Sequence, residues 1–289
     1  SALTYSTNFS EVDTRSITEV SADEIPDFDL MLAGFPCQAF SLAGKQKGFA
    51  ETRGTLFFDI QRILLNKIKK GKNPAAFMLE NVSNLMHHDK GKTFDIIMNI
   101  LQNELNYDVH VQILNSRHYG VPQNRPRIFI IGFAKKTDFS FPEKKKEITL
   151  DSILEPWGTV DSKYYISQKY YEGLNRHRDR HRLKGNGFGY QVIERNDVAN
   201  TLVLGGMGRE RNLVKDKPKM VYKNGLDKMK YRNKFGIRKL TIAEYSRLQG
   251  INDKTFVFPV SNTQAYKQIA NSVSVPVIEA IAKEVLKHI

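Results

Sequence analysis

The chain contains a single cysteine, Cys37, among 289 residues. One thiol excludes an internal disulfide, and we find no apolar run long enough to cross a bilayer and no leader in which positive charge precedes an apolar stretch. We therefore expect a soluble, cytoplasmic protein that makes no membrane contact. A chain of this length can bury a large core and form one large domain plus a smaller one.

Acidic residues are scarce in one part of the chain only. The formal net charge is +13, from 44 Lys and Arg and 31 Asp and Glu. Residues 163–239 hold 20 of the basic and 7 of the acidic side chains, which leaves 24 of each sign elsewhere. Because the whole excess lies in one segment, we expect contact with a polyanion such as nucleic acid. A basic surface without a partner is the alternative.

The lone cysteine follows a short apolar run. Residues 30–35, Leu-Met-Leu-Ala-Gly-Phe, match a buried central strand of a parallel sheet better than a helix. Pro36 fixes its own φ angle and disfavours helical backbone at Phe35, so Cys37 is expected at the carboxyl end of the strand, where open α/β sheets carry their chemistry. A lone cysteine is more often an inert small hydrophobic residue, so its role depends on its neighbours.

Strand and helix patterns alternate along much of the chain. Short apolar runs predict strands at residues 30–35, 75–79, 109–114 and 127–133. Apolar residues at helical spacing predict helices at 55–70, 93–105, from the N-cap Thr241 to Gly250, and at 276–288. This alternation is typical of an α/β fold with a doubly wound, mostly parallel sheet. We expect a catalytic domain formed by residues 1–155 and 240–289, and a small, loop-rich basic domain at 156–239 with one strand near 200–204.

Polar residues lie at the ends of successive predicted strands: Cys37, Glu80 and the pair Arg125 and Arg127. A thiolate nucleophile beside a carboxyl group that holds a proton, with guanidinium donors nearby, suits attack on an electron-poor ring whose developing charge must be neutralised. Taken singly, Glu80 could be a helix-start carboxylate and the arginines surface charges. Their joint occurrence on neighbouring strand ends indicates a catalytic site.

These residues lie in motifs that resemble those of the bacterial cytosine-C5 DNA methyltransferases. Residues 35–38 resemble the Pro-Cys-Gln motif, 80–82 the Glu-Asn-Val motif, 123–127 the Gln-x-Arg-x-Arg motif, 238–250 the motif that packs the recognition domain against the catalytic one, and 268–273 the last motif, with Ala270 where glycine is usual. Five motifs in order make a strong signal. The resemblance implies the Rossmann-like fold of S-adenosylmethionine-dependent methyltransferases and the activity of a DNA (cytosine-5-)-methyltransferase.

The resemblance also implies a role for each catalytic residue. Cys37 is expected to add to C6 of the target cytosine while Glu80 holds or donates a proton at N3, which makes C5 nucleophilic. C5 then takes a methyl group from S-adenosylmethionine, and loss of the C5 proton with release of Cys37 restores the ring. Arg127, and with it Arg125, is expected to bind the O2 edge of the cytosine.

Such chemistry requires the cytosine to be flipped out of double-stranded DNA, with a basic loop at residues 41–53 closing behind it. The expected DNA contacts near this loop are Gln38, Ser41, Lys45 and Arg53. A recognition segment at 164–231 resembles the family's pattern around 187–190 and 200–202. Its expected DNA contacts are Arg176, Arg178, Arg180, Arg209 and Arg211. Whether these arginines read guanines or touch only phosphates stays open.

One departure from the family pattern concerns the cofactor. We do not find two features of the family's cofactor site in residues 1–289. One is a strand that ends in a Phe-x-Gly-x-Gly turn, and the other is a following strand that ends in an acidic residue for the ribose. The glycines at 205–208 lack the strand-turn-helix context of such a loop. We expect a missing N-terminal segment or a second chain to supply it. The remaining expected contacts to S-adenosylmethionine are Asp13, Pro36, Leu56, Asn271 and Val273, and no metal site is expected.

Two further hypotheses remain beside the DNA enzyme. One branch of the family modifies tRNA with the same motifs, so an RNA cytosine-C5 methyltransferase is the second, although a large basic recognition segment favours duplex DNA. A non-catalytic DNA-binding module is the third, supported only by the missing glycine-rich turn. For the DNA enzyme the family implies a monomer in a restriction-modification system, with a cognate restriction endonuclease.

Overall fold

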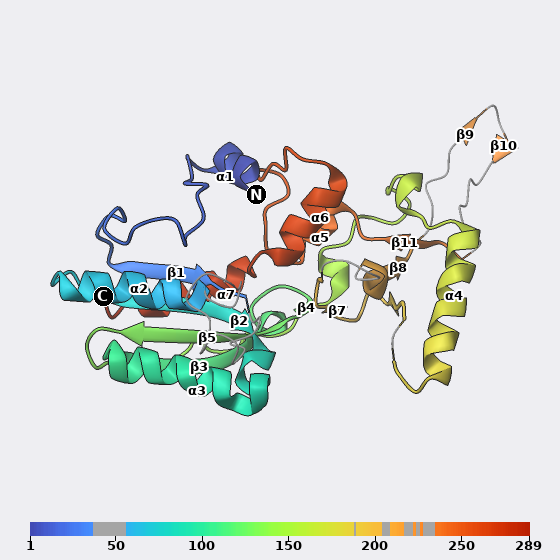
Figure 1. Ribbon diagram of the computed structural model, residues 1–289. Helices are drawn as coiled ribbons and strands as arrows, with labels where there is room; N and C mark the ends of the chain where they lie inside the picture. The colour runs from blue at the N-terminus through green and yellow to red at the C-terminus, as the bar shows by residue number, and fades with distance from the viewer. Residues whose placement is uncertain (37–55, 188, 204–208, 217–221, 224–225, 228–234) are drawn as a thin grey trace. The chain divides into compact units, whose positions relative to one another are not determined.

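The computed structural model of the protein describes residues 1–36, 56–187, 189–203, 209–216, 222–223, 226–227 and 235–289 (Figure 1). The chain forms two compact units. Unit 1 consists of Ser1–Val12, Ser116–Arg125 and Lys144–Ile278, and unit 2 of Asp13–Asn115, Pro126–Glu143 and Glu279–Ile289. Each unit is therefore assembled from segments that are far apart in the sequence.

Unit 2 is built around a four-stranded sheet with the order β1-β2-β5-β3. Its strands are β1 (Leu30–Gly34), β2 (Ala76–Val82), β3 (Asp108–Asn115) and β5 (Pro126–Phe133). β1 and β2 pair in parallel, whereas β5 is antiparallel to both β2 and β3. Three strands therefore share one direction, and β5, which the alternating pattern placed in a parallel sheet, runs against them.

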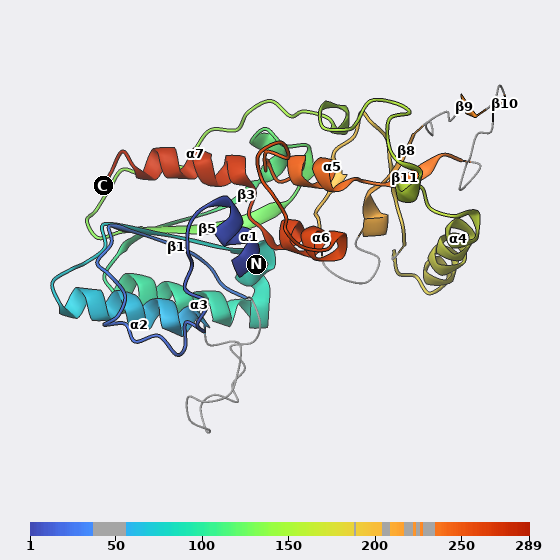
Figure 2. The ribbon, with the colours of Figure 1, turned by 90° about the horizontal axis from the view of Figure 1, so that it is seen from above.

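Helices cover both faces of this sheet. Figure 2 shows α2 (Leu56–Lys69) and α3 (Lys92–Asn99) along one face, and the unit 2 part of α7 (Val275–Val285) along the other. α3 continues into the π-helical turn η4 (Ile100–Glu104). The core on the α2 and α3 side includes Phe57, Leu64, Phe77, Leu79, Ile97 and Ile128, all buried. The predicted α/β, doubly wound fold class is confirmed.

The position of β1 differs from the prediction of a buried central strand. β1 has no strand partner on its second edge among the described residues, and Leu32 is 59% exposed. Met31 and Ala33 point to the other face and pack against the core. An edge strand with one covered face alternates in burial, whereas the apolar run alone predicted burial on both faces.

Unit 1 contains short strands and several helices. Its strands are β4 (Gln123–Asn124), β6 (Val192–Ile193), β7 (Ala199–Asn200), β8 (Leu213–Lys215), β9 (Tyr222–Lys223), β10 (Leu226–Asp227) and β11 (Ile237–Lys239). Its α-helices are α1 (Ala2–Asn8), α4 (Gln168–Leu183), α5 (Ile242–Arg247) and α6 (Asn262–Asn271). β11, β8 and β6 form one small sheet, and β4 pairs with β7. The strand expected at 200–204 is thus only two residues long.

Short 3₁₀ segments also occur in the two units: η3 (Ser83–Gly91), η5 (Ser116–His118), η6 (Leu150–Ser152), η7 (Ser162–Tyr164) and η8 (Arg209–Asn212).

The predicted start and stop of α5 are confirmed by its caps. The Thr241 hydroxyl accepts a hydrogen bond from the Glu244 N–H, and the Glu244 carboxylate accepts one from the Thr241 N–H. This capping box satisfies backbone donors that the first helical turn leaves unpaired. Beyond the helix, Gly250 has a φ of 74°, where a side chain would be strained and would also collide with Pro276.

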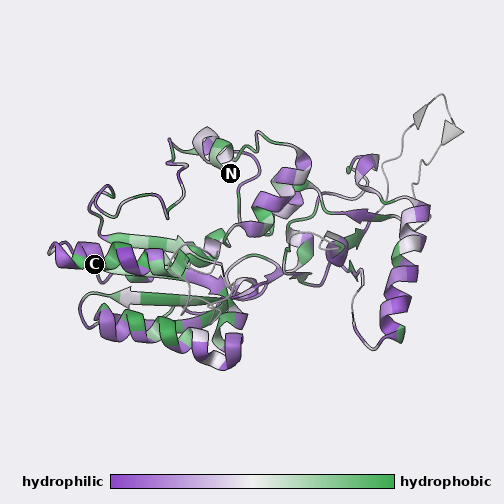
Figure 3. Ribbon diagram, viewed as in Figure 1, coloured by the Kyte–Doolittle hydropathy of each residue, from purple (hydrophilic) through white to green (hydrophobic). Residues whose placement is uncertain are grey.

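α4 was not predicted, because the segment around it reads as loop. Figure 3 shows the helix coloured mainly as hydrophilic. It begins after the N-cap Ser167, whose hydroxyl accepts a hydrogen bond from the Tyr170 N–H, and it buries Leu174. A helix with so few apolar residues has a weak periodic signal in the sequence. Packing against the rest of unit 1 therefore contributes more to its stability than its own amphipathic pattern does.

Within the described residues, no helix has the length and apolar character needed to span a membrane.

Gly132→Ala is expected to destabilise unit 2. A Cβ at Gly132, which faces Phe77 across β5 and β2, would lie 2.1 Å from the Phe77 ring. That ring is fully buried against Tyr107 and cannot move away. We expect a loss of about 1–3 kcal/mol in the free energy of unfolding, measured by urea titration.

The matched control is Gly173→Ala in α4, where the nearest atom to an added Cβ is Arg176 Nη2 at 3.8 Å. This variant is expected to keep or gain stability, by up to about 1 kcal/mol, since alanine favours helix. Equal stability of the Gly132→Ala variant and the parent protein would contradict the packing described for Phe77.

Candidate active site

Glu80 and Arg127 form an ion pair at one edge of the unit 2 sheet. Arg127 Nε lies 3.1 Å from Glu80 Oε1, and the two side chains are 16% and 18% exposed. Glu80 is near the carboxyl end of β2, and Arg127 is near the amino end of β5. The two predicted catalytic residues are therefore brought together in a largely buried position.

The reversed direction of β5 is the reason for this contact. In the register of the two strands, Val82 of β2 lies opposite Arg127 of β5. The amino end of an antiparallel strand meets the carboxyl end of its neighbour, whereas a parallel β5 would carry Arg127 to the opposite edge of the sheet. Glu80 and Arg127 thus meet only because β5 is antiparallel to β2.

The end of β1 lies beside the same carboxylate. Gly34 is opposite Glu80 in the parallel register, and a Cβ at Gly34 would be 3.8 Å from Glu80 Oε2. Asn81 Nδ2 donates a buried hydrogen bond of 2.8 Å to the Phe35 carbonyl, and the Asn81 side chain also accepts one from the Val82 N–H. The backbone two residues before Cys37 is therefore tied directly to the strand that carries Glu80.

The surroundings of the Glu80–Arg127 pair orient the Arg127 guanidinium beside the Glu80 carboxyl group. Burial lowers the pKa of Arg127, and the nearby charge of Glu80 opposes this effect. Arg127 Nη1 also donates to the Pro126 carbonyl at 2.8 Å, which orients the guanidinium. A carboxyl group and an oriented guanidinium side by side provide a proton-holding group and N–H donors for an adjacent carbonyl oxygen.

Arg125 is in the other compact unit and has different partners. Its side chain is 4% exposed. Nη1 donates to the Leu202 carbonyl at 3.3 Å, and Nη2 donates to the Ala270 and Ser272 carbonyls at 3.3 and 2.8 Å. The guanidinium predicted to share the role of Arg127 thus bonds backbone oxygens inside unit 1.

The residues expected to contact the cofactor divide between the two units. In unit 2, Asp13 is half-exposed and pairs with Arg15 at 2.8 Å, and hydrogen bonds from the Arg15 side chain and backbone hold the pKa of Asp13 below its usual value. The exposed Pro36 and the half-buried Leu56 are in the same unit. Asn271 and Val273 are exposed in unit 1, just at and after the end of α6.

The predicted nucleophile Cys37 lies outside the described residues, as do four predicted DNA contacts: Gln38, Ser41, Lys45 and Arg53. The side chain of Arg209 is likewise not described, although its backbone is in η8. Arg211 is exposed.

The arginines of α4 have two different environments. Arg176 and Arg180 are exposed. Arg178 is also exposed, with 47% of its side chain accessible, but it stacks on Tyr190, with its guanidinium carbon 4.6 Å from the ring centroid, and donates to Asn175 at 3.0 Å. Arg178 therefore joins α4 to the residue stretch before β6 while part of its side chain faces solvent, as Arg176 and Arg180 do.

Two lysines extend the exposed arginines into a line that sequence reasoning missed. Lys169, Arg176 and Arg180 follow one another at spacings of seven and four residues, which places them on one side of α4, and Lys184, four residues later, is the C-cap of that helix. Leu174 is buried on the opposite side. We call these four residues the basic stripe. Their spacing is visible in the sequence once the segment is known to be helical.

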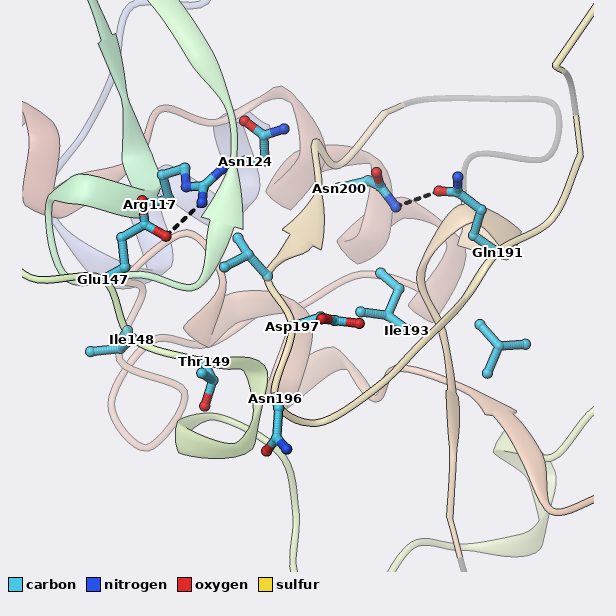
Figure 4. A pocket seen from close by; sticks show the side chains of 12 residues that line it. Arg117, Asn124, Glu147, Ile148, Thr149, Gln191, Ile193, Asn196, Asp197 and Asn200 are labelled. Atoms are coloured by element: carbon cyan, nitrogen blue, oxygen red, sulfur yellow. Dashed lines mark hydrogen bonds and ion pairs between the residues drawn. The ribbon is translucent and has the colours of Figure 1, made fainter.

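A polar recess of about 580 Å³ lies within unit 1 (Figure 4). Arg117 and Glu147 pair across it at 2.6 Å, and Asn200 Nδ2 donates to Gln191 Oε1 at 2.7 Å. The Arg117 hydrogen bond lowers the pKa of Glu147. With Asp197 also in the lining, acidic groups outnumber the single arginine, so the recess is poorly suited to a phosphate.

A fully buried cluster of charged side chains joins β11 and the end of β8 to α5. Arg238 Nε lies 2.6 Å from Asp216, and its two Nη atoms each lie 2.8 Å from Glu244. Burial alone would lower the pKa of Arg238, but the hydrogen bonds and charges of Glu244 and Asp216 raise it. Glu244 also accepts from the Glu155 N–H at 2.9 Å, so four chain segments meet at this group.

Comparison with known proteins gives a consistent result. The family model described as C-5 cytosine-specific DNA methylase matches residues 1–287. The chain is 46% identical over 292 residues to the Type II methyltransferase M.HpaII of Haemophilus parainfluenzae, covering 99% of this chain and 80% of that protein. It is 43% identical over 291 residues to the Type II methyltransferase M1.ScrFI of Lactococcus lactis subsp. cremoris, covering 98% and 69%.

Two solved structures have the same fold. The S. pombe Dnmt2 methyltransferase gives a TM-score of 0.72 at 16% identity, covering 99% of this chain and 87% of that one. The Entamoeba histolytica methyltransferase EhMeth gives 0.69 at 17% identity, covering 99% and 86%. At these identities the likeness concerns the fold alone.

Arg238→Met is expected to destabilise unit 1 strongly, because it leaves two buried carboxylates without their counter-charge. We expect a loss of about 3–5 kcal/mol in the free energy of unfolding, measured by urea titration. Arg247→Met is the matched control: Arg247 pairs with Asp253 and Glu155 but is 28% exposed, so its loss is expected to cost about 1 kcal/mol or less. Similar losses for both variants would show that burial of the Arg238 group is not decisive.

Proposed function

The chain belongs to the C-5 cytosine-specific DNA methylase family and is a DNA cytosine-C5 methyltransferase, and from this premise we propose how its residues carry out the reaction. Its substrate is then a cytosine in double-stranded DNA, which must leave the base stack before any side chain can reach its ring. The observation that carries the residue assignment is the Glu80–Arg127 pair beside the end of β1.

In the proposed reaction the Cys37 thiolate forms a bond to C6 of the flipped cytosine. Glu80 holds a proton at N3, and Arg127 donates to O2, so the negative charge that develops on the ring is neutralised. C5 becomes nucleophilic and is methylated. Loss of the C5 proton then breaks the bond from Cys37 to C6 and restores the aromatic ring. The hydrogen bond from Asn81 to Phe35 supports this assignment, since it holds the backbone before Cys37 against the Glu80 strand.

S-adenosylmethionine supplies the methyl group when it is bound. We propose that Asp13, Pro36, Leu56, Asn271 and Val273 hold its adenosine part. The glycine-rich turn that receives the methionine part of the cofactor in this family would come from a further polypeptide segment, in this chain or in a second one. Among the described residues, β1 pairs with a strand on one edge only, so an additional strand of such a segment would fit on its other edge.

For DNA, we propose that residues 156–239 form the target recognition domain and that 1–155 and 240–289 form the catalytic domain. Gln38, Ser41, Lys45 and Arg53 would contact the DNA around the flipped base. The basic stripe would contact phosphates, and Arg209 and Arg211 would also contact DNA. Arg178 would both contact DNA through its exposed part and hold α4 by stacking on Tyr190. Because relatives at 43–46% identity carry the name Type II methyltransferase, we propose that this enzyme also acts in restriction-modification, beside a cognate restriction endonuclease.

Covalent trapping tests the proposed catalytic residues. With S-adenosylmethionine and DNA in which 5-fluorocytosine replaces cytosine, the C5 fluorine cannot leave as a cation, so the intact enzyme is expected to remain bonded to DNA. Cys37→Ser is expected to form no adduct, and Glu80→Gln to form it on the order of 10²–10⁴-fold more slowly. The adduct is measured by denaturing gel electrophoresis. An adduct with Cys37→Ser, or one formed only on RNA, would refute the proposal.

Salt dependence tests the basic stripe. The logarithm of the DNA association constant falls linearly with the logarithm of salt concentration, with a slope set by the number of phosphate contacts. Arg176→Ala and Arg180→Ala are each expected to reduce that slope by about 1, equally on target and unrelated duplexes. Lys283→Ala, which removes an exposed lysine of unit 2, should leave the slope unchanged. An unaltered slope in both arginine variants would mean that α4 does not touch phosphates.

A further inference from the structure

Three buried polar side chains join segments of unit 1 that are distant in the sequence. Gln123, Arg125 and Gln249 are all nearly or fully inaccessible to solvent. Their side chains bond backbone groups in the recognition segment, in the turn after α5 and at the end of α6. We call these three residues the polar brace.

One end of the polar brace holds the end of α6. Gln249 Nε2 donates to the carbonyls of Ile269 and Ser272, both at 3.0 Å. Arg125 Nη2 donates to the carbonyls of Ala270 and Ser272. The last carbonyls of a helix lack partners within it and carry partial negative charge, so a guanidinium and an amide are suitable donors there. Asn271 and Val273, the proposed cofactor contacts, lie between and directly after these bonded carbonyls.

The other end of the polar brace holds Leu202. Gln123 Oε1 accepts from the Leu202 N–H at 3.1 Å, and Arg125 Nη1 donates to the Leu202 carbonyl at 3.3 Å. Gln123 lies opposite Ala199 in the β4–β7 pair, which fixes the start of the same stretch. Gln123 Nε2 also donates to Gln249 Oε1 at 3.1 Å, so the two ends are linked side chain to side chain.

We propose that Gln123, Arg125 and Gln249 are positioning residues through which the recognition stretch at 199–202 and the cofactor turn at 271–273 fix each other's place. This inference rests on the proposed function, in which residues 156–239 read DNA and Asn271 and Val273 hold the cofactor. Arg125 bonds both stretches, and buried donors and acceptors are costly to leave unpaired, so a shift of one stretch disturbs the bonds of the other. Binding of S-adenosylmethionine and of target DNA therefore strengthen each other by the same factor.

This inference gives Arg125 a different role from the one that its motif predicted, which was to bind the O2 edge of the cytosine together with Arg127. Its Nη atoms bond three carbonyl oxygens within unit 1, so it acts on the reaction through the backbone that it holds. Arg127, two residues later, remains the arginine proposed to touch the cytosine.

The test compares cofactor affinity with and without DNA. Isothermal titration of the intact protein with S-adenosylmethionine is carried out alone and with a duplex carrying the target site, which bisulfite sequencing of DNA methylated in cells identifies. We expect the duplex to tighten cofactor binding on the order of 10-fold in the parent protein. In Arg125→Met and Gln249→Met this factor is expected to fall to about 1, and Arg125→Lys should recover part of it.

Arg195→Met is the matched control within unit 1. Arg195 is partly buried, bonds Asp151 and the Glu155 carbonyl, and stacks on Trp157. These partners are all far in the chain from Leu202 and from the end of α6. It should lower thermal stability while keeping the factor of the parent protein. Gln249→Met removes fewer bonds than Arg125→Met and carries the test should the arginine variant fail to fold.

The outcomes separate this inference from the proposed function. If the parent protein is trapped on 5-fluorocytosine DNA and binds the cofactor, but DNA does not change cofactor affinity, the coupling is absent and the inference is wrong. It is also wrong if folded brace variants retain the parent factor. If no covalent adduct forms with the parent protein, the proposed function itself fails.

Discussion

The antiparallel pairing of β5 with β2 is the constraint on which the geometry of the proposed catalytic site depends. It places Arg127 opposite Val82 and within 3.1 Å of the Glu80 carboxylate, at the edge of the sheet where β1 also ends. A guanidinium and a carboxyl group that meet in this way form a charged pair out of bulk water, where electrostatic interactions are stronger. The direction of one strand thus decides whether the motifs form a site.

Buried polar side chains also fix stretches of backbone within each unit. Asn81 bonds the Phe35 carbonyl in unit 2, and the polar brace does the same for Leu202 and the α6 end in unit 1. Arg238, with Asp216 and Glu244, holds the recognition segment by charge. Each group needs a specific partner geometry to offset the cost of burial, whereas apolar packing tolerates small shifts. These contacts therefore give the enzyme a defined arrangement of loops rather than only a stable core.

Much of the fold and part of the site were predictable from the sequence. Four strands and three of the helices followed from apolar spacing, and Thr241 and Gly250 marked the ends of α5 through their local chemistry. The reversal of β5 and the edge position of β1 were not, because both depend on which strand pairs with which. α4 was missed since charged residues dominate it and its apolar contacts to the neighbouring core come from Tyr171 and Leu174.

The sequence by itself determined the family and the residue types available for the chemistry, because motif order and spacing are properties of the chain alone. It also placed the excess positive charge in one segment. Only the tertiary structure decided which of the two motif arginines meets Glu80 and which holds backbone carbonyls. It likewise showed that Arg178, although exposed like Arg176 and Arg180, stacks on Tyr190. The physical reason is that the role of a charged side chain is set by its partners, and partners distant in the chain are brought together only by folding.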